Sequence, residues 1–184
     1  MVIIKNNYYL YIENLDDLNF NILKANKKIN IIYRNSKNHN FQEIIKLRKK
    51  CKVKKFKFFV ANNDVIAQKI KADGLYISAY NKKKYYTQLS KIGSAHNLRE
   101  IDQKKRQNCK TIFFSRLFKT NYINKKNHLG VIKFNLLNLN INTNLIPLGG
   151  IKYHNLLKLN MVRCKGFAFL SGIKKKPVIT NRLF

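Results

Sequence analysis

The polar residues best suited to chemistry follow directly after β-rich runs of the sequence. Arg and Lys bind phosphate oxygens, Arg as a bidentate fork and Lys as a point charge. An Asp beside them can hold a Mg²⁺ ion that bridges phosphates, and glycines let backbone N–H groups approach an anion closely. In chain order the candidates are Arg34 and Lys37, Asn63 and Asp64, Ser78–Asn81, Ser94 and His96, Arg116 and Thr120, Gly149 and Gly150, and Leu170–Gly172. This set predicts an anionic, phosphorylated ligand, provided that the fold brings the residues together.

Eight short runs rich in β-branched and aromatic residues precede these candidates. Because the stretches between the runs are mostly too long for hairpins, the pattern predicts parallel strands with crossover connections. The runs 57–61 and 111–115 are strongly apolar, as in a sheet that is buried on both faces. The predicted strands are 8–13, 30–34, 57–61, 74–78, 91–95, 111–115, 144–148 and 166–171. The predicted helices are 17–25, 42–50, 64–71, 98–107 and 154–161, with a short helix or turn over 85–89.

Eight such units predict an α/β fold, a single (β/α)8 barrel that spans residues 1–184 as one domain. In this fold the carboxyl ends of the strands carry the ligand site, so the candidates would gather at one end of the barrel. The chain has 184 residues, whereas the fold typically takes about 250. We therefore expect reduced helices after the fourth and sixth strands, and a long loop with a weak helix over 121–144. A doubly wound α/β sheet with fewer strands is the alternative.

The charge of the chain is strongly one-sided. Lys and Arg number 38 and Asp and Glu number 8, which gives a formal net charge of +30. Such a balance is typical of proteins that bind nucleic acid or another polyanion. The lysines are spread along the chain without an RNA-binding motif, however, and compositional drift of the surface explains them equally well. Nucleic acid is thus an alternative partner that the sequence does not favour.

The cysteines and the apolar runs bear on the compartment. Cys51, Cys109 and Cys164 are odd in number, lie far apart and form no Cys-x-x-Cys pair. We therefore expect reduced thiols in the core, without disulfides or structural zinc. The apolar runs are far shorter than the ~18 residues of a membrane span, and the N-terminus lacks the pattern of a signal peptide. These features predict a cytoplasmic protein with no membrane partner.

Several candidates also have a structural interpretation. Asp64 opens a helical pattern and would serve there as a helix N-cap. His96 is better interpreted as a structural or capping residue than as a base. Ser94, Thr120 and the pair Gly149-Gly150 also suit ordinary turns.

The motifs at the predicted strand ends resemble, in their order, those of the thiamine phosphate synthase family, which includes the thiazole tautomerase (TenI-like) proteins. The resemblance covers residues 29–173. It rests on Asn63-Asp64, Ala72-Asp73-Gly74, Ser94-Ala95-His96-Asn97, Phe118-x-Thr120, Gly149-Gly150-Ile151 and Leu170-Ser171. It implies a (β/α)8 barrel in which a Mg²⁺-assisted substitution joins hydroxymethylpyrimidine diphosphate to thiazole phosphate. The implied reaction passes through a pyrimidine carbocation and releases diphosphate.

Carried over residue by residue, the resemblance implies two groups of contacts and a metal site. The implied diphosphate and pyrimidine contacts are Arg34, Lys37, Asn63 and Ser94, and the implied thiazole phosphate contacts are Thr120, Gly150, Leu170 and Ser171. The implied Mg²⁺ ligands are Asp64 and, as a weaker neutral ligand, Asn81. The chain departs from the family pattern at Ile32, Ser36, Asn81, Tyr122 and Ile123. Lys125 and Lys126 lie a loop shift away from the last of these positions.

These departures lie mainly on the diphosphate and metal side and leave two functions open. The first is a synthase that uses phosphorylated pyrimidine and thiazole substrates with Mg²⁺. The second is a non-catalytic or tautomerase-like barrel that binds a phosphorylated ligand. The tautomerase branch is not clearly favoured, because its characteristic His after the sixth strand falls on Arg116.

Overall fold

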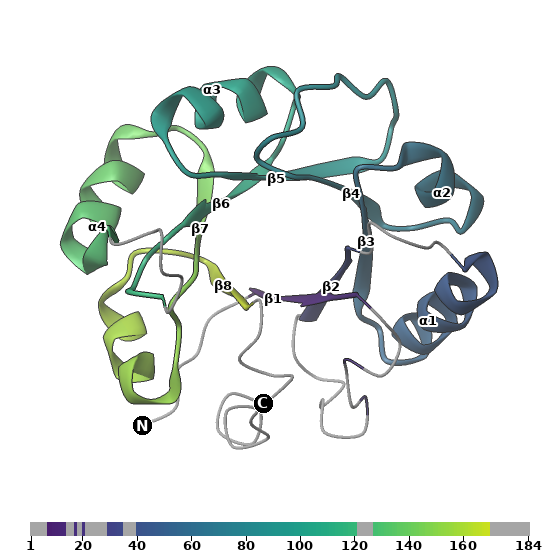
Figure 1. The fold of residues 1–184 in the computed structure, drawn as a ribbon, viewed down its shortest axis with the longest axis horizontal. Helices are drawn as coiled ribbons and strands as arrows, with labels where there is room; N and C mark the ends of the chain where they lie inside the picture. Colours follow the sequence, from purple (N-terminus) through teal and green to yellow (C-terminus); the bar gives the residue numbers. More distant parts are fainter. Residues whose placement is uncertain are drawn as a thin grey trace.

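Eight parallel strands pair in chain order and close into a barrel in this computed structural model (Figure 1). The structure describes residues 7–13, 17, 20, 29–34, 40–120 and 127–169. The strands are β1 (Asn7–Ile12), β2 (Ile29–Tyr33), β3 (Lys57–Ala61), β4 (Gly74–Ile77), β5 (Ser90–Ala95), β6 (Thr111–Ser115), β7 (Asn144–Leu148) and β8 (Gly166–Phe169). Because β1 pairs with both β2 and β8, the predicted (β/α)8 barrel is confirmed and the doubly wound alternative is wrong.

The helices surround the barrel on its outside (Figure 1). They are α1 (Phe41–Val53), α2 (Asp64–Lys69), α3 (Leu98–Arg106), α4 (Gly130–Asn140) and the 3₁₀-helix η2 (Tyr153–Met161). Helix α1 is amphipathic, because its buried residues Ile44, Leu47 and Cys51 share one helical face. The predicted helix 17–25 and the end of the predicted eighth strand, 170–171, lie outside the described residues.

One of the two predicted helix reductions is confirmed and the other is wrong. The connection between β4 and β5 contains no helix, so the helix after the fourth strand is reduced as expected, and the helical alternative over 85–89 does not form. The helix after β6 is not reduced, because α4 has 11 residues. Its asparagines read as loop formers in the sequence, but the Nδ2 atoms of Asn135 and Asn138 donate to the carbonyl oxygens of Met161 (2.9 Å) and Arg163 (2.6 Å). These bonds tie α4 to the segment at the end of η2.

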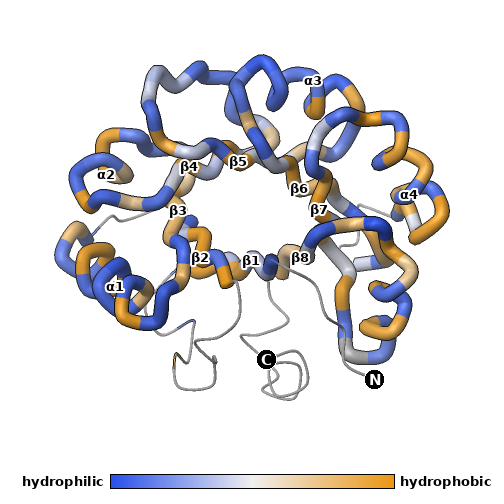
Figure 2. Tube along the Cα trace, turned by 180° about the vertical axis from the view of Figure 1, so that it is seen from behind, coloured by the Kyte–Doolittle hydropathy of each residue, from blue (hydrophilic) through white to orange (hydrophobic). Residues whose placement is uncertain are grey.

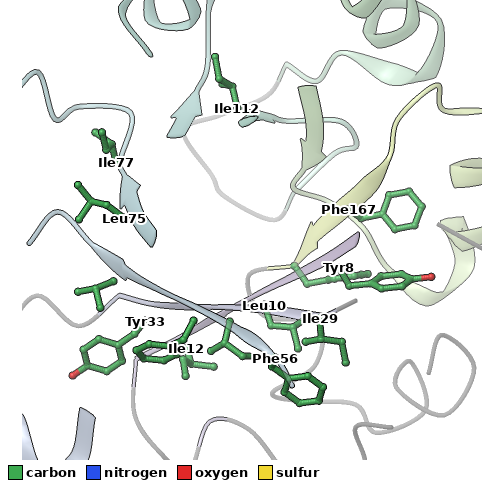
Figure 3. Close-up of a cluster of buried hydrophobic side chains, with 14 of the residues drawn as sticks. Tyr8, Leu10, Ile12, Ile29, Tyr33, Phe56, Leu75, Ile77, Ile112 and Phe167 are labelled. Carbon is green, nitrogen blue, oxygen red and sulfur yellow. The ribbon is translucent and has the colours of Figure 1, made fainter. Parts of the chain in front are cut away.

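Two apolar layers form the core. Alternate residues of the strands point into the barrel, where they make a closed inner cluster of Tyr9, Tyr11, Ile32, Phe59, Tyr76, Ile92, Phe113, Ile146, Leu148 and Ala168. The larger outer cluster lies between strands and helices, and Figure 3 shows part of it around β1 and β2, with Leu10, Ile29 and Phe56 among its members. The regular alternation of the strands thus separates the ligand-facing interior from the helix-packing exterior.

The helices differ in the polarity of their outer surfaces. In Figure 2 α3 is mostly hydrophilic, whereas α4 and η2 carry hydrophobic stretches, and Ile132, Leu139 and Leu157 there are exposed. None of the helices in the described residues is long and apolar enough to cross a membrane.

The three cysteines form no disulfide with one another: Cys51 and Cys109 are buried and Cys164 is half-buried. Burial raises the pKa of Cys51 to about 12 and that of Cys109 to about 11.

Candidate functional site

Arg34 lies at the mouth of the barrel, where β2 ends, together with a group of buried hydroxyls from the strands. The hydroxyl of Tyr76 donates to Ser94 Oγ over 2.8 Å, and both residues are buried. Burial raises the pKa of Tyr76, the hydrogen bond to Ser94 lowers it, and the positive charge of Arg34 lowers it further. The predicted contacts Arg34 and Ser94 are therefore brought to the same part of the barrel mouth, with Tyr76 between them.

Tyr11 is a residue that sequence reasoning missed. Its hydroxyl is buried inside the barrel and has no hydrogen-bond partner in the described part of the chain. Burial raises the pKa of Tyr11 well above its usual value, the neighbouring Tyr76 hydroxyl raises it further, and the positive charge of Arg34 lowers it. The alternation of β1 could have found it, because Tyr9 and Tyr11 share one face of the strand. An orphaned buried hydroxyl is costly, so Tyr11 offers a hydrogen bond to a ligand in the barrel mouth.

Asn63 and Asp64 follow β3 and begin α2. The N-cap of this helix is Asn63, whose Oδ1 accepts from Ile66 N over 2.9 Å. The interpretation of Asp64 as the N-cap is therefore wrong, and Asp64 is instead the first residue of the helix. Asp64 is half-buried, and its carboxylate makes no hydrogen bond or ion pair with another residue in the described part of the chain.

Asn81 belongs to a hydrogen-bond network that joins the ends of β3 and β4. Its Nδ2 donates to Asn62 Oδ1 (3.0 Å) and to Tyr85 Oη (2.8 Å), and its Oδ1 accepts from Lys83 N (2.9 Å). Asn62 Oδ1 also accepts from Ser78 N (3.0 Å). Burial raises the pKa of Tyr85, the Asn81 bond lowers it, and the nearby Asp64 carboxylate raises it further. The two predicted metal ligands thus lie in the same neighbourhood, and Asn62 and Tyr85 are additions that the sequence did not single out.

The loops after β6 and β7 bring Thr120 and Gly150 together. Arg116 Nη1 donates to Thr120 Oγ1 over 3.2 Å, and the Arg116 side chain packs closely against Gly149. Gly150 has a φ of +71° and lies against the main chain of Phe118 and Lys119, where a Cβ would not fit. Glycine is therefore needed at this position because the main chains of the two loops pack directly against each other.

A buried asparagine that sequence reasoning missed holds this second loop. Asn155 Nδ2 donates to the carbonyl oxygen of Gly150 (2.8 Å), and Asn155 Oδ1 accepts from Lys152 N (2.8 Å). Its position inside a predicted helix gave no signal for this role. The other predicted contacts, Lys37, Leu170 and Ser171, lie outside the described residues, as do the departures at Ser36, Tyr122 and Ile123.

The residue His96 serves the start of α3, in agreement with its interpretation as a structural or capping residue. Glu100 Oε2 accepts from His96 N (2.7 Å) and lies 3.0 Å from His96 Nδ1, while Asn97 Oδ1 accepts from Glu100 N (2.9 Å). The backbone N–H groups of His96 and Glu100 therefore both have side-chain acceptors at the start of α3.

The residues around Asp64 supply one of the carboxylates that a Mg²⁺ ion would need. Mg²⁺ in phosphate-binding sites is held by one or two carboxylates together with substrate phosphates and water. Asp64 supplies one carboxylate, whereas the Asn81 amide is already committed to three hydrogen bonds. Groups of three or more His, Cys, Asp or Glu side chains suited to a metal do not occur among the described residues. The arrangement therefore suits an ion shared between Asp64 and a phosphorylated ligand.

The fold places this protein in the class of (β/α)8 barrels, whose ligand sites lie at the carboxyl ends of the strands. The chain belongs to the thiamine monophosphate synthase family, whose sequence model matches residues 21–173. This confirms the family that the strand-end motifs indicated. No curated protein matches the chain significantly.

Two solved structures show the same fold at low sequence identity. Thiamine phosphate pyrophosphorylase from Pyrococcus furiosus is 17% identical with a TM-score of 0.76, and the match covers 97% of this chain and 93% of that one. Thiamine phosphate pyrophosphorylase from Bacteroides thetaiotaomicron is 14% identical with a TM-score of 0.63, and the match covers 90% and 82%. At these identities the likeness concerns the fold.

Proposed function

We propose that this chain is a thiamine phosphate synthase, which joins hydroxymethylpyrimidine diphosphate to thiazole phosphate with release of diphosphate. The observation that carries the proposal is the arrangement at the barrel mouth. Arg34 and Asp64 follow β2 and β3 and Ser94 lies near the carboxyl end of β5, whereas Thr120 and Gly150 follow β6 and β7. Two anionic substrates can therefore be held at two parts of one site, a first arc of Arg34, Asp64 and Ser94 and a second arc of Thr120 and Gly150. The family membership of residues 21–173 supports these substrates.

The first arc suits the diphosphate and the pyrimidine ring. Arg34 would donate to diphosphate oxygens, and Asn63 Nδ2 would donate beside it, because its Oδ1 is occupied as the helix cap. Mg²⁺ held by Asp64 would neutralise charge on the diphosphate when bound. The buried hydroxyls of Tyr11, Tyr76 and Ser94 would meet polar atoms of the pyrimidine.

The second arc suits the thiazole phosphate. Backbone N–H groups near Gly150 and the side chains of Arg116 and Thr120 would bind its phosphate oxygens. Holding both substrates across the mouth aligns the thiazole nitrogen with the pyrimidine methylene carbon. As the C–O bond to diphosphate breaks, the leaving group takes that electron pair, and the nitrogen lone pair forms the new C–N bond. Stabilisation of the departing diphosphate is the main contribution of the first arc.

The test is a direct assay of diphosphate release and thiamine phosphate formation by the purified chain with both substrates and Mg²⁺. Asp64→Ala should lower turnover by about 10²–10³-fold, because it removes the carboxylate on the leaving-group side. Asp102→Ala on the exposed face of α3 is the matched control and should leave turnover unchanged.

Failure would take a recognisable form. If the wild-type chain produces no thiamine phosphate but still binds thiazole phosphate in a titration, the synthase proposal is wrong and a diverged, binding-only barrel remains. The replacement of a second carboxylate by the engaged Asn81 is the observation that favours this second candidate.

A further inference from the structure

A lysine is completely buried behind the site. Lys104 of α3 is 0% exposed, although α3 is otherwise a polar surface helix. Its Nζ donates to the main-chain carbonyl oxygen of Asn81 over 2.8 Å and to Gln107 Oε1 over 2.9 Å. These partners are neutral, and burial lowers the pKa of Lys104. Lysine is rarely fully buried, and burying its charge is costly, so a lysine kept in this position calls for a reason.

Gln107 extends the contact from α3 to the same segment. Its Nε2 donates to the carbonyl oxygens of Asn81 (3.0 Å) and Lys83 (2.8 Å). Together, Lys104 and Gln107 make three hydrogen bonds to the main-chain carbonyl oxygens of Asn81 and Lys83 between β4 and β5. This is the connection that contains no helix and that lies between α2 and α3 in Figure 1. A segment without its own ladder of hydrogen bonds is thus held by a neighbouring helix.

The barrel makes room for this lysine. A Cβ on Gly93 of β5 would lie 2.9 Å from Lys104 Cδ and 3.0 Å from Cys109 Sγ. The aliphatic stem of Lys104 therefore packs directly over the strand, and its length is used to carry the ammonium group from α3 to the β4–β5 connection.

The orientation of the Asn81 amide follows from fixed backbone donors. Ser78 N points at Asn62 Oδ1, so that atom is an acceptor, and the Asn81 atom beside it must be the donor Nδ2. Lys83 N points at the other Asn81 atom, which must be Oδ1. The Asn81 side chain is consequently held by Asn62 and the Lys83 N–H, and the Asn81 main-chain carbonyl is held by Lys104.

We propose that Lys104 is a positioning residue that, with Gln107, clamps the β4–β5 connection and so holds Asn81, Asn62 and Ser78 as a rigid frame beside Asp64. In this arrangement the role of Asn81 is to fix the positions of its hydrogen-bonded neighbours at the barrel mouth. The kinetic consequence of this clamp rests on the proposed synthase function, whereas the structural consequence does not.

Lys104→Met tests the clamp, because methionine keeps much of the apolar stem and removes the ammonium group. Lys105→Met, on the exposed neighbouring position of the same helix, is the matched control. We expect the amides of Asn81 and Lys83 to exchange with deuterium about tenfold to hundredfold faster in Lys104→Met. Amides of the β5 and β6 core strands should keep wild-type exchange rates.

A selective change in the substrate parameters distinguishes positioning from general stability. Lys104→Met should raise KM for the pyrimidine diphosphate by about tenfold and leave KM for thiazole phosphate unchanged, since the clamp lies on the first arc. Lys105→Met should change neither parameter. An equal effect on both substrates would overturn the positioning role.

The exchange measurement stands even if the chain proves to have no synthase activity. Unchanged exchange at Asn81 and Lys83 in folded Lys104→Met would overturn the clamp itself. Should Lys104→Met not fold, Gln107→Leu removes the other half of the clamp and leaves Lys104 bonded to Asn81. That variant should show the same local acceleration, and its absence would equally overturn the proposal.

Discussion

Residues inside the barrel mouth combine apolar packing with hydroxyl chemistry. Tyr11 and Ile32 lie side by side on β1 and β2, and both side chains belong to the inner cluster. Ile32 is one of the positions at which the chain departs from the family pattern, and it supplies no polar group there. The unpartnered hydroxyl of Tyr11 lies next to it and near Arg34.

Tyr11→Phe should raise stability and weaken substrate binding. Removing a buried hydroxyl that has no partner should raise the free energy of unfolding by about 1 kcal/mol, measured by chemical denaturation. The same variant should raise KM for the pyrimidine diphosphate. Tyr85→Phe is the contrasting control, because Tyr85 Oη donates to the carbonyl oxygen of Asn62 over 2.9 Å and its loss should lower stability. A stability loss in Tyr11→Phe would show that its hydroxyl is satisfied in solution.

Gly150→Ala should impair the second arc of the site. The φ of +71° is unfavourable for alanine, and the new Cβ would meet the main chain of Phe118 and Lys119. Gly130→Ala is the control, because its φ is +74° but nothing lies within 4 Å of the added Cβ. Both variants should lose about 1–2 kcal/mol from backbone strain. Gly150→Ala should lose more and should also bind thiazole phosphate more weakly in calorimetry; equal losses and equal binding would contradict this.

At the scale of elements, asparagine begins three of the helices. Asn40, Asn63 and Asn97 each cap a helix by accepting a backbone N–H with the side-chain oxygen. An abundance of asparagine that suggests loops in the sequence is thus used to start helices at defined positions after strands. This use positions Asp64, because the cap at Asn63 sets the direction in which α2 leaves β3.

Glu100→Gln should reveal the electrostatic part of the α3 start. Burial raises the pKa of Glu100, but hydrogen bonds from His96 and Asn97 outweigh it, and the pKa is lowered overall. The carboxylate therefore stabilises the folded state above the ordinary pKa of glutamate, and this contribution is lost as pH falls through the lower folded pKa. At pH 7 the variant should be less stable by about 0.5 kcal/mol.

The measurement is the difference in free energy of unfolding between wild type and Glu100→Gln as a function of pH. It should be present above the ordinary pKa of glutamate, about 4.3, and shrink as the pH falls below that value. A difference that grows on acidification would mean that the carboxyl is favoured in its neutral form in the folded protein.

For the whole molecule, the net charge is +30, and most of the lysines and arginines that the structure describes are exposed. Within the barrel mouth, Arg34 and Arg116 are the described cations on which the proposed site depends. The net charge therefore does not identify the ligand, and its main expected effect is on the stability of the folded protein. Like charges on one surface repel each other and oppose the compact state.

Added salt should stabilise the protein. Raising the ionic strength from about 0.01 M to about 0.15 M shortens the screening length from about 30 Å to about 8 Å. Weaker repulsion should raise Tm by about 2–4 °C for each 1 kcal/mol gained in a chain of this size. Thermal melts in NaCl and KCl should agree, since the effect is one of screening. A fall in Tm with salt would show that favourable ion pairs outweigh repulsion.

Much of the fold and part of the site could be predicted from the sequence. Each strand was recognisable because β-branched and aromatic residues form continuous runs, and position at a strand end placed Arg34, Asp64 and Gly150 at one edge of the barrel. The helix of 130–140 was underestimated because its asparagines act through contacts with residues more than 20 positions away. Local propensity carries no information about such contacts.

The sequence by itself determined the order of the strands, their parallel arrangement and the set of polar residues that follow them, because these depend on local composition and connection length. The tertiary structure decided which side chains meet. Lys104 reaches Asn81 and Asn62 reaches Ser78 because barrel closure places α3 and the ends of β3 and β4 beside one connection. Contacts of this kind depend on strand register and inward alternation around the closed sheet, which join residues that no local pattern relates.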